Sequence, residues 1–307
     1  MKDIVLIDGG LGQEIYLRSN KPAHPLWGAQ VMIEEPDIVK QVHQDFIRAG
    51  AKIITTNSYT CTPSRLARDA DENWFEDLQI KSYDIANEAR TELGFTAEEV
   101  QIGASIPPLI GSFTSDKRPF QELKDEYKRI VDIQSSRADL FIVETISVIR
   151  EAQAAVEAAL EGNKPILLSL TLSDENPHTL RSGEKITDAI DTLKDYDIQG
   201  FLFNCSYPES ITQGMKYLKQ QNLPYGGYAN AFTTVEPLKP GGTVDNLKAR
   251  KDLDAQDHAR QVLGWVEEGA TIVGGCCEVG PDEIAELRNQ LVEKGYSLTA
   301  LKLAYKY

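Results

Sequence analysis

The segment ATIVGGCCEVG, residues 270–280, joins a short apolar run to two glycines and then to two adjacent cysteines. The run ending at Val273 predicts a strand, and the glycines let the chain turn behind it. Cys276 and Cys277 would then follow the carboxyl end of that strand. Three interpretations are open: unreactive buried thiols, a disulfide between the two neighbours, or thiolate ligands of a soft metal ion.

Seven further apolar runs lie along the chain, and amphipathic stretches separate most of them. They are DIVLID (3–8), AKIITTN (51–57), VQIGAS (100–105), LFIVET (140–145), PILLSLT (165–171), GFLFNC (200–205) and PYGGYAN (224–230). Several lack polar alternation, as strands covered on both faces do. Segments 37–49 and 254–268 have helical spacing, and Asp254 can cap the second. Eight strand-then-helix units predict an α/β fold, a single (β/α)8 TIM barrel over residues 1–307.

Composition narrows the function classes. The 307 residues, 41% of them hydrophobic, can build a full core, and no linker, low-complexity segment or repeat divides them. The net charge of −15 argues against nucleic acid or an anionic membrane as partner and favours small molecules. No apolar run is long enough to span a membrane, and the first predicted strand leaves no room for a signal peptide, so we expect a cytoplasmic protein.

A barrel of this kind gathers its functional residues at the carboxyl ends of its strands. Those positions hold Asp8 with Gly9 and Gly10, Asn57 to Tyr59, Ser105, Glu144, Thr171, Cys205, Asn230, and Cys276 with Cys277. Cys205 follows the sixth strand and the cysteine pair follows the eighth, so one rim would carry three thiols. Three thiolates suit Zn²⁺ and leave its fourth position to substrate or water.

The other candidate metal ligands lie elsewhere in the sequence. Cys61 has no partner nearby, and we expect a core or pocket residue. The four histidines fall outside the strand ends and are His24, His43, His178 and His258. No fourth protein ligand is therefore predicted, which favours a catalytic over a structural metal site.

Several motifs together resemble the zinc-dependent homocysteine S-methyltransferase family. They are DGGLGQEI (8–15), ITTNSYTCTP (54–63), LFIVETI (140–146), LRSGE (180–184), FNCSYPE (203–209) and GATIVGGCC (269–277). The order NC then GGCC is the specific signal, and the match spans nearly the whole chain. Two features depart from the family: Glu283 stands where a histidine is common, and YANAFTTVEP (228–237) lacks the usual YPN.

The resemblance implies a (β/α)8 barrel with Cys205, Cys276 and Cys277 as zinc ligands. It also implies that Asp8 and Glu144 hold the ammonium of an amino-acid substrate, whereas a helix cap and a rim salt bridge are the alternatives for these acids. The residues themselves suggest that Gly9 and Gly10 offer backbone N–H groups to a carboxylate. Further pocket-lining candidates are Asn57, Tyr59 and Ser105.

The implied reaction is zinc-dependent methyl transfer from a sulfonium donor to the thiol of homocysteine, giving methionine. S-methylmethionine and S-adenosylmethionine are the expected cationic donors, and no protein nucleophile is needed because the substrate thiolate attacks the methyl group. Betaine as donor, or another small thiol or a selenol as acceptor, are alternatives with the same chemistry. A zinc-binding or thiol-binding protein without turnover is the non-enzymatic alternative.

Overall fold

Parallel strands form one curled sheet in the order β2-β3-β4-β5-β6-β7-β8-β1-β9 in the computed structural model, which describes residues 2–238, 240–244 and 247–302. The strands are β1 Asp3–Leu6, β2 Ile53–Thr55, β3 Gln101–Ile106, β4 Leu140–Ile146, β5 Ile166–Leu170, β6 Gly200–Asn204, β7 Tyr225–Ala229, β8 Ile272–Gly275 and β9 Ser297–Leu298. Each of the eight predicted runs contains one of these strands. The two-residue β9 was not predicted, because nothing in its sequence sets it apart from a loop.

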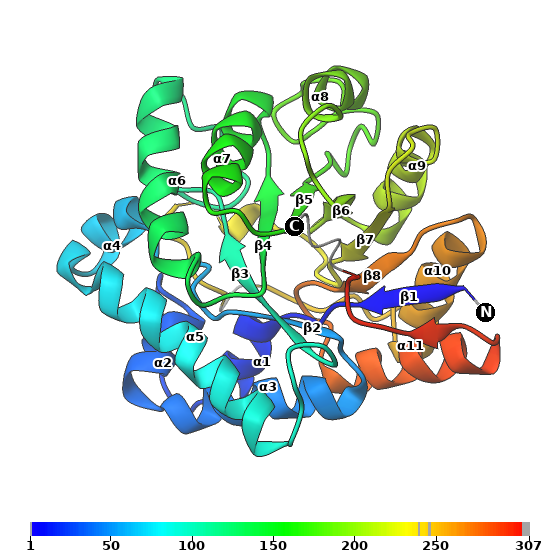
Figure 1. The fold of residues 1–307 in the computed structure, drawn as a ribbon, viewed down its shortest axis with the longest axis horizontal. Helices are drawn as coiled ribbons and strands as arrows, with labels where there is room; N and C mark the ends of the chain where they lie inside the picture. Colours follow the sequence, from blue (N-terminus) through cyan, green and yellow to red (C-terminus); the bar gives the residue numbers. More distant parts are fainter. Residues whose placement is uncertain (1, 239, 245–246, 303–307) are drawn as a thin grey trace.

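Main-chain hydrogen bonds also link β1 to β2, the strands at opposite ends of the eight-strand series. The Lys52 N–H donates to the Leu6 carbonyl at 2.7 Å, and the Asp8 N–H donates to the Ile53 carbonyl at 2.9 Å. Figure 1 shows the strands at the centre with helices arranged around them. The predicted α/β class is confirmed as a TIM-barrel-like curled sheet.

Helices follow most strands and cover the outer face of the sheet (Figure 1). They are α1 Leu11–Arg18, α2 Gly28–Glu34, α3 Pro36–Ala49, α4 Pro63–Asp69, α5 Phe75–Glu92, α6 Phe120–Gln134, α7 Ile149–Glu161, α8 Ile186–Leu193, α9 Pro208–Leu218, α10 Ala255–Glu267 and α11 Pro281–Glu293, with short 3₁₀ turns η1 Glu72–Trp74 and η2 Glu236–Leu238. The predicted helices correspond to α3 and α10. The Asp254 side chain accepts the Asp257 N–H at 2.9 Å, which confirms the predicted cap.

Buried apolar side chains form two clusters on the two faces of the sheet. The larger cluster lies between strands and helices and includes Phe46 of α3 and Phe141 of β4. The smaller cluster gathers side chains from inside the curled sheet, such as Ile142 and Leu202, together with the three cysteines that follow β6 and β8. Alternate residues of β1, β4 and β6 supply the two clusters, as strands covered on both faces do.

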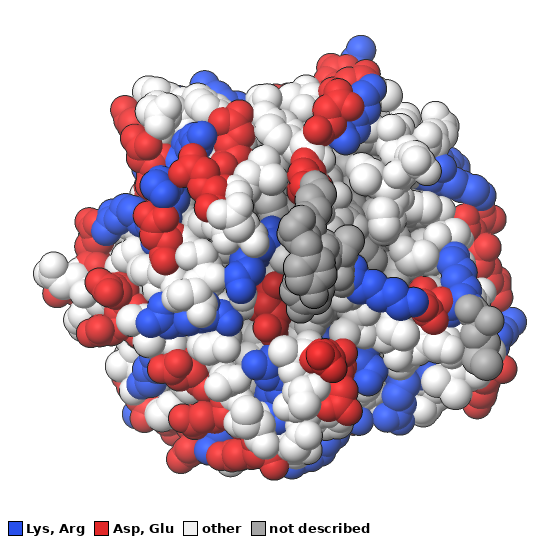
Figure 2. Space-filling model, viewed as in Figure 1, with Lys and Arg blue, Asp and Glu red and all other residues white. Residues whose placement is uncertain are grey.

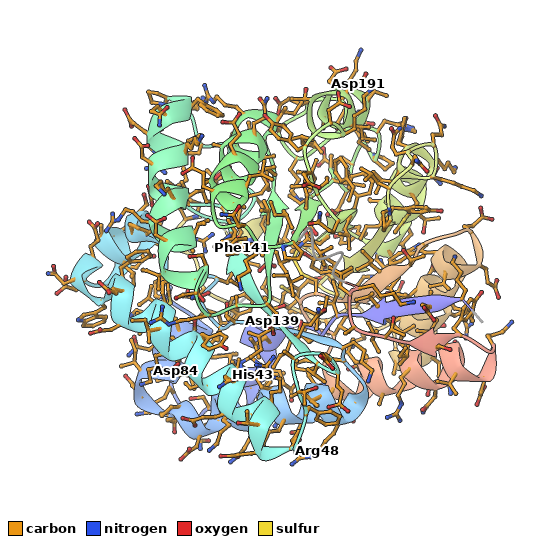
Figure 3. The ribbon with its side chains drawn as sticks, viewed as in Figure 1. His43, Arg48, Asp84, Asp139, Phe141 and Asp191 are labelled. Atoms are coloured by element: carbon orange, nitrogen blue, oxygen red, sulfur yellow. A yellow bond between two sulfur atoms is a disulfide. The ribbon has the colours of Figure 1, made fainter. Side chains whose placement is uncertain are left out.

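The outer surface carries charge of both signs. On the face shown in Figure 2, acidic and basic side chains are interspersed rather than gathered into one basic surface. Figure 3 places Asp191 of α8 at the periphery, whereas Phe141 lies toward the centre. Within the described ranges, no helix is both long and apolar enough to cross a membrane.

The contact between β7 and β8 yields a test of the fold. A Cβ atom at Gly226 would lie 1.6 Å from the Ile272 carbonyl oxygen, so Gly226→Ala should lower the free energy of unfolding by about 3 kcal/mol or more. Gly264 in α10 has no atom within 4 Å of such a Cβ, and Gly264→Ala should stabilise the protein by about 0.5–1 kcal/mol. Urea unfolding of both variants checks this. Equal stability of the two variants would contradict the β7–β8 register.

Candidate functional site

Three sulfur atoms lie together at the carboxyl ends of β6 and β8. The Sγ atoms of Cys205, Cys276 and Cys277 are all within 4.8 Å of one another, and all three residues are buried. Strand β7 lies between their strands and holds both loops: the Cys205 N–H donates to the Tyr228 carbonyl, and the Cys276 N–H donates to the Ala229 carbonyl. The sheet thus brings together the thiols that the sequence separates by seventy residues.

Two of these sulfurs form a disulfide. Cys205 and Cys276 are joined, whereas Cys277 has a free thiol. The disulfide between the neighbours Cys276 and Cys277, one of the three interpretations of the sequence, is therefore not formed. Cys276 pairs instead with Cys205, at the end of another strand. In this state only one of the predicted ligands is a thiol, and three thiolates require two-electron reduction of the Cys205–Cys276 bond.

The sulfur cluster fits a soft metal ion in its reduced state. Three buried sulfurs this close supply the donor type and number of a three-cysteine zinc site. In the metal-free protein, burial raises the pKa of the Cys277 thiol to about 12. A cation at the cluster would favour the thiolates and offset this effect of burial.

Cys61 and the histidines lie away from the sulfur cluster. Cys61 is fully buried, and among the described residues the group of candidate metal ligands contains neither it nor any histidine. His43 is labelled in Figure 3 in the helical layer, on α3, and His258 is on α10. The expectation that Cys61 is buried is confirmed.

One cavity adjoins the sulfur cluster, and every predicted site residue except Ser105 lines it. The lining includes Asp8, Gly9, Gly10, Asn57, Tyr59, Glu144, Cys205, Cys276 and Cys277. The lining encloses about 830 Å³ of non-atom space, which includes the part open to solvent.

Two carboxyl groups face this cavity from β1 and β4. The Asp8 carboxylate accepts the Thr55 N–H at 2.7 Å and the Thr55 hydroxyl at 3.0 Å. The Glu144 carboxylate accepts the Ser105 hydroxyl at 2.6 Å. Ser105 itself is fully buried and does not line the cavity, so its hydroxyl orients Glu144 from behind.

Burial raises the pKa of both acids. Loss of solvent is the main cause for Asp8, opposed by its hydrogen bonds with Thr55, and its pKa is about 7. Burial likewise raises the pKa of Glu144 to about 7, against the hydrogen bond from Ser105. A substrate ammonium bound between two buried acids would stabilise the charges of both.

The glycine turn after β1 packs directly against the loop that carries the cysteine pair. A Cβ at Gly9 would lie 2.0 Å from the Val279 carbonyl oxygen, and one at Gly10 would lie 2.6 Å from the Cys276 carbonyl oxygen. The Gly10 N–H donates to the Val279 carbonyl at 2.8 Å. The expectation of an open Gly10 N–H for a substrate carboxylate is therefore wrong, because the neighbouring loop uses that donor.

Aromatic side chains that the sequence analysis missed complete the cavity wall. Trp27 and Phe113 line it beside Tyr59, whose hydroxyl lies 2.8 Å from that of Ser112. The Asn57 amide donates to the Gly28 carbonyl at 2.9 Å and so holds the Trp27 loop as well as lining the cavity. Trp27 and Phe113 lie in irregular loops, where no periodic pattern marks a residue as part of a site.

Comparison with known proteins gives the family. A sequence model described as homocysteine S-methyltransferase matches residues 5–291. The chain belongs to the homocysteine S-methyltransferase family. This membership confirms the family and the enzyme class predicted from the sequence, an S-methyltransferase that acts on a thiol.

Individual relatives and solved structures of the family match over most of their length. Homocysteine S-methyltransferase of Escherichia coli (strain K12) is 27% identical, over 94% of this chain and 95% of the relative. Selenocysteine methyltransferase of Astragalus bisulcatus is 28% identical, over 91% of this chain and 90% of the relative. The crystal structure of the homocysteine methyltransferase MmuM from E. coli in its metallated form has a TM-score of 0.78 at 26% identity, covering 94% of this chain and 96% of that one. The crystal structure of the oxidized form of MmuM has a TM-score of 0.77 at 25% identity.

The family motif LRSGE (180–184) lies behind the sulfur cluster. The Arg181 guanidinium pairs with Asp174, donates to the Cys205 carbonyl at 3.4 Å and stands 4.6 Å from the centroid of the Phe113 ring. Cys205 has a φ of 48°, in the left-handed region that a non-glycine residue rarely adopts. The motif thus connects the backbone of one candidate ligand to the aromatic wall of the cavity.

The two departures from the family have local structural roles. Glu283 is in the first turn of α11, and its carboxylate accepts the Gly280 N–H at 2.8 Å, so it caps the helix. In the segment after β7, the Tyr228 hydroxyl donates to Ser169, and the Ala231 N–H donates to the Cys277 carbonyl. This segment therefore supports the cysteine loop without the usual proline.

The raised pKa of Glu144 predicts how stability depends on pH in this family member. Because the pKa of Glu144 rises from 4.5 to about 7 on folding, the folded state holds the Glu144 proton more tightly than the unfolded state does. This tighter proton binding stabilises the fold fully below pH 4.5, and the stabilisation is lost by pH 7. Glu144→Gln does not ionise. The ligand-free variant should therefore gain thermal stability relative to wild type between pH 5 and pH 8.

Melting curves at the two pH values measure this gain. The control is Glu122→Gln, at an exposed glutamate of α6. This variant should leave the pH dependence of the melting temperature unchanged. A Glu144→Gln protein with the same pH dependence as wild type would show that this carboxyl group is not desolvated.

Proposed function

We propose that this protein transfers a methyl group from a sulfonium donor to the thiol of homocysteine, forming methionine. The observation that carries the proposal is the meeting, in one cavity, of three sulfurs within 4.8 Å and two buried acids, in a chain of this family. S-methylmethionine and S-adenosylmethionine are the proposed donors. The fold would be a closed (β/α)8 barrel comprising residues 1–307, supported by the hydrogen bonds between β1 and β2.

Cys205, Cys276 and Cys277 would hold one Zn²⁺ ion once the disulfide is reduced. Bound there, the ion would lower the pKa of a substrate thiol, so that thiolate is present at neutral pH. Three thiolate ligands supply much negative charge, which leaves the substrate sulfur nucleophilic. The sulfurs lie at the cavity wall, where a small thiol can reach them.

The remaining residues bind and orient. Asp8 and Glu144 would receive the acceptor ammonium, and the Thr55 and Ser105 hydrogen bonds fix the two carboxylates for it. The thiolate would then attack the methyl group of the donor. A new sulfur–methyl bond forms, the donor's sulfur–methyl bond breaks, and the rest of the donor leaves as a neutral thioether. The thiol would lose its proton to solvent before this step, so the displacement itself needs no proton transfer, and catalysis would come from the lowered thiol pKa and from positioning by the cavity.

A selenol is a second candidate acceptor. The chain is 27–28% identical to two selenium methyltransferases, Selenocysteine Se-methyltransferase of Brassica oleracea var. italica and Selenocysteine methyltransferase of Astragalus bisulcatus. A selenol is already ionised at neutral pH, and the same cavity offers the same acids to its ammonium. The cytoplasmic location expected from the sequence stays a prediction.

An assay of methionine formation tests the reaction. Reduced, zinc-loaded protein should form methionine from homocysteine with S-methylmethionine or S-adenosylmethionine, and betaine should support little turnover. Selenocysteine in place of homocysteine tests the second acceptor. If no donor supports turnover and homocysteine leaves the metal coordination unchanged in a titration, the protein binds zinc without catalysis.

Substitution of the sulfurs tests the metal site. Reduced wild-type protein should hold about one zinc per chain, and Cys205→Ser should lose both zinc and turnover while keeping its circular dichroism, since a hydroxyl is a far poorer zinc ligand than thiolate. Cys61→Ser, at a buried cysteine outside the cluster, is the matched control. Retention of zinc and activity by Cys205→Ser would show that the ligand set is wrong.

A further inference from the structure

A second lobe adjoins the main cavity on the side away from the sulfurs. The two spaces share a wall formed by Trp27, Tyr59, Ser112 and Leu238, and the lobe is lined further by Arg65 and by His24 and Arg68. None of the three clustered cysteines and neither of the two acids lines it. The lobe therefore differs in charge from the main cavity: one end is acidic and the other is basic.

Arg65 is a buried cation that forms no ion pair, although its charge lowers the pKa of the more distant Glu144 and Glu151. Its side chain is only 4% exposed, and its guanidinium stands 4.9 Å from the centroid of the Tyr59 ring. One Nη donates to the Pro108 carbonyl at 2.8 Å, whereas the Nε–H has no partner. Among the described residues, no carboxylate lies within 4.0 Å of Arg65. A buried charge of this kind calls for an anion.

The indole of Trp27 carries a second unused donor at the same wall. Its buried Nε1–H has no acceptor in the described structure. Trp27 has a φ of 49°, and its loop is fixed by hydrogen bonds from Asn57 to the Gly28 carbonyl and from Thr60 to the Leu26 carbonyl. A non-glycine residue held in this backbone conformation is often part of a binding site. Two unsatisfied N–H groups beside one lobe indicate a missing acceptor.

Arg68, the other arginine of the lobe, does not share this property. Its guanidinium pairs with the neighbouring Asp69 and donates to the Ile110 carbonyl. Arg65 is therefore the arginine of the lobe that forms no ion pair.

We propose that the Arg65 Nε–H and the Trp27 Nε1–H bind the carboxylate of the methyl donor, a sulfonium compound with a free carboxylate group. This inference rests on the proposed methyl-transfer function. In the proposed function the acceptor occupies the main cavity, with its ammonium at Asp8 and Glu144 and its sulfur at the cysteines. The lobe is then left for the second substrate, the methyl donor. The donor carboxylate at the basic end would direct the sulfonium centre across the Trp27 and Tyr59 wall toward the sulfurs.

Calorimetry of donor binding to the reduced, zinc-loaded protein tests the inference. The two probes are S-methylmethionine and its decarboxylated analogue, (3-aminopropyl)dimethylsulfonium. Wild type should bind the carboxylate-bearing probe about 30-fold more tightly, the size expected for hydrogen bonds to a charged group. Arg65→Met should remove that difference without weakening binding of the analogue, and Trp27→Phe should reduce the difference in the same direction.

Arg129→Met is the matched control. Arg129 also stands over an aromatic ring, 5.0 Å from the centroid of Phe75, but lies outside the lobe, and its loss should leave both affinities unchanged. Equal losses for both probes in Arg65→Met, with Trp27→Phe unchanged, would show that Arg65 only supports the fold and would overturn the inference.

A third probe separates the two substrates. If Arg65→Met removes the difference in affinity between homocysteine and 3-aminopropanethiol, its decarboxylated analogue, and keeps the difference between the two donors, Arg65 binds the acceptor and the donor assignment is wrong. Methionine formation is scored separately. Methionine formation by a wild-type protein that binds both donor probes equally would contradict the carboxylate site in the lobe but not the proposed reaction. Tighter binding of S-methylmethionine than of its analogue, without methionine formation from any donor, would contradict the proposed reaction but not the carboxylate site.

Discussion

The close approach of two backbones, after β1 and after β8, is the constraint on which the candidate site depends. The turn at Gly9 and Gly10 lies against the loop from Cys276 to Val279 so tightly that no side chain fits between them. The Gly10 N–H to Val279 hydrogen bond fixes the contact. As a result, the Asp8 carboxyl and the cysteine pair, which are nearly the whole chain apart in sequence, line the same cavity.

The surroundings of this contact determine the charge of the groups in the cavity. Burial raises the pKa of Asp8, Glu144 and Cys277, so each anion is disfavoured until a cation arrives. A substrate ammonium and a soft metal ion are cations of the two kinds that carboxylates and thiolates accept. The cavity is therefore arranged for positive ligands at its acidic end, while the positively charged Arg65 lies beyond the aromatic wall.

Redox state decides how many sulfurs are available at this site. The disulfide between Cys205 and Cys276 and a metal bound by both residues as thiolates exclude one another, because the disulfide sulfurs carry no negative charge. The same proximity that suits the three sulfurs to one ion lets two of them oxidise when no ion is held. Arg181 donates to the Cys205 carbonyl in the disulfide form.

Local patterns in the sequence determined the strands, two of the helices and the residues at the strand ends. An apolar run bounded by polar residues specifies a buried strand by itself, and a parallel sheet places all such ends on one edge, which is why the meeting of Cys205 with Cys276 could be predicted. Tertiary structure alone decided which cysteines pair, that the Gly10 N–H is occupied, and that Ser105 stands behind Glu144. It also placed Trp27 and Phe113 around the cavity and Arg65 in the adjoining lobe. These features depend on segments far apart in the sequence that meet in the fold, and their contacts are set by the neighbours that the whole fold supplies rather than by their own sequence.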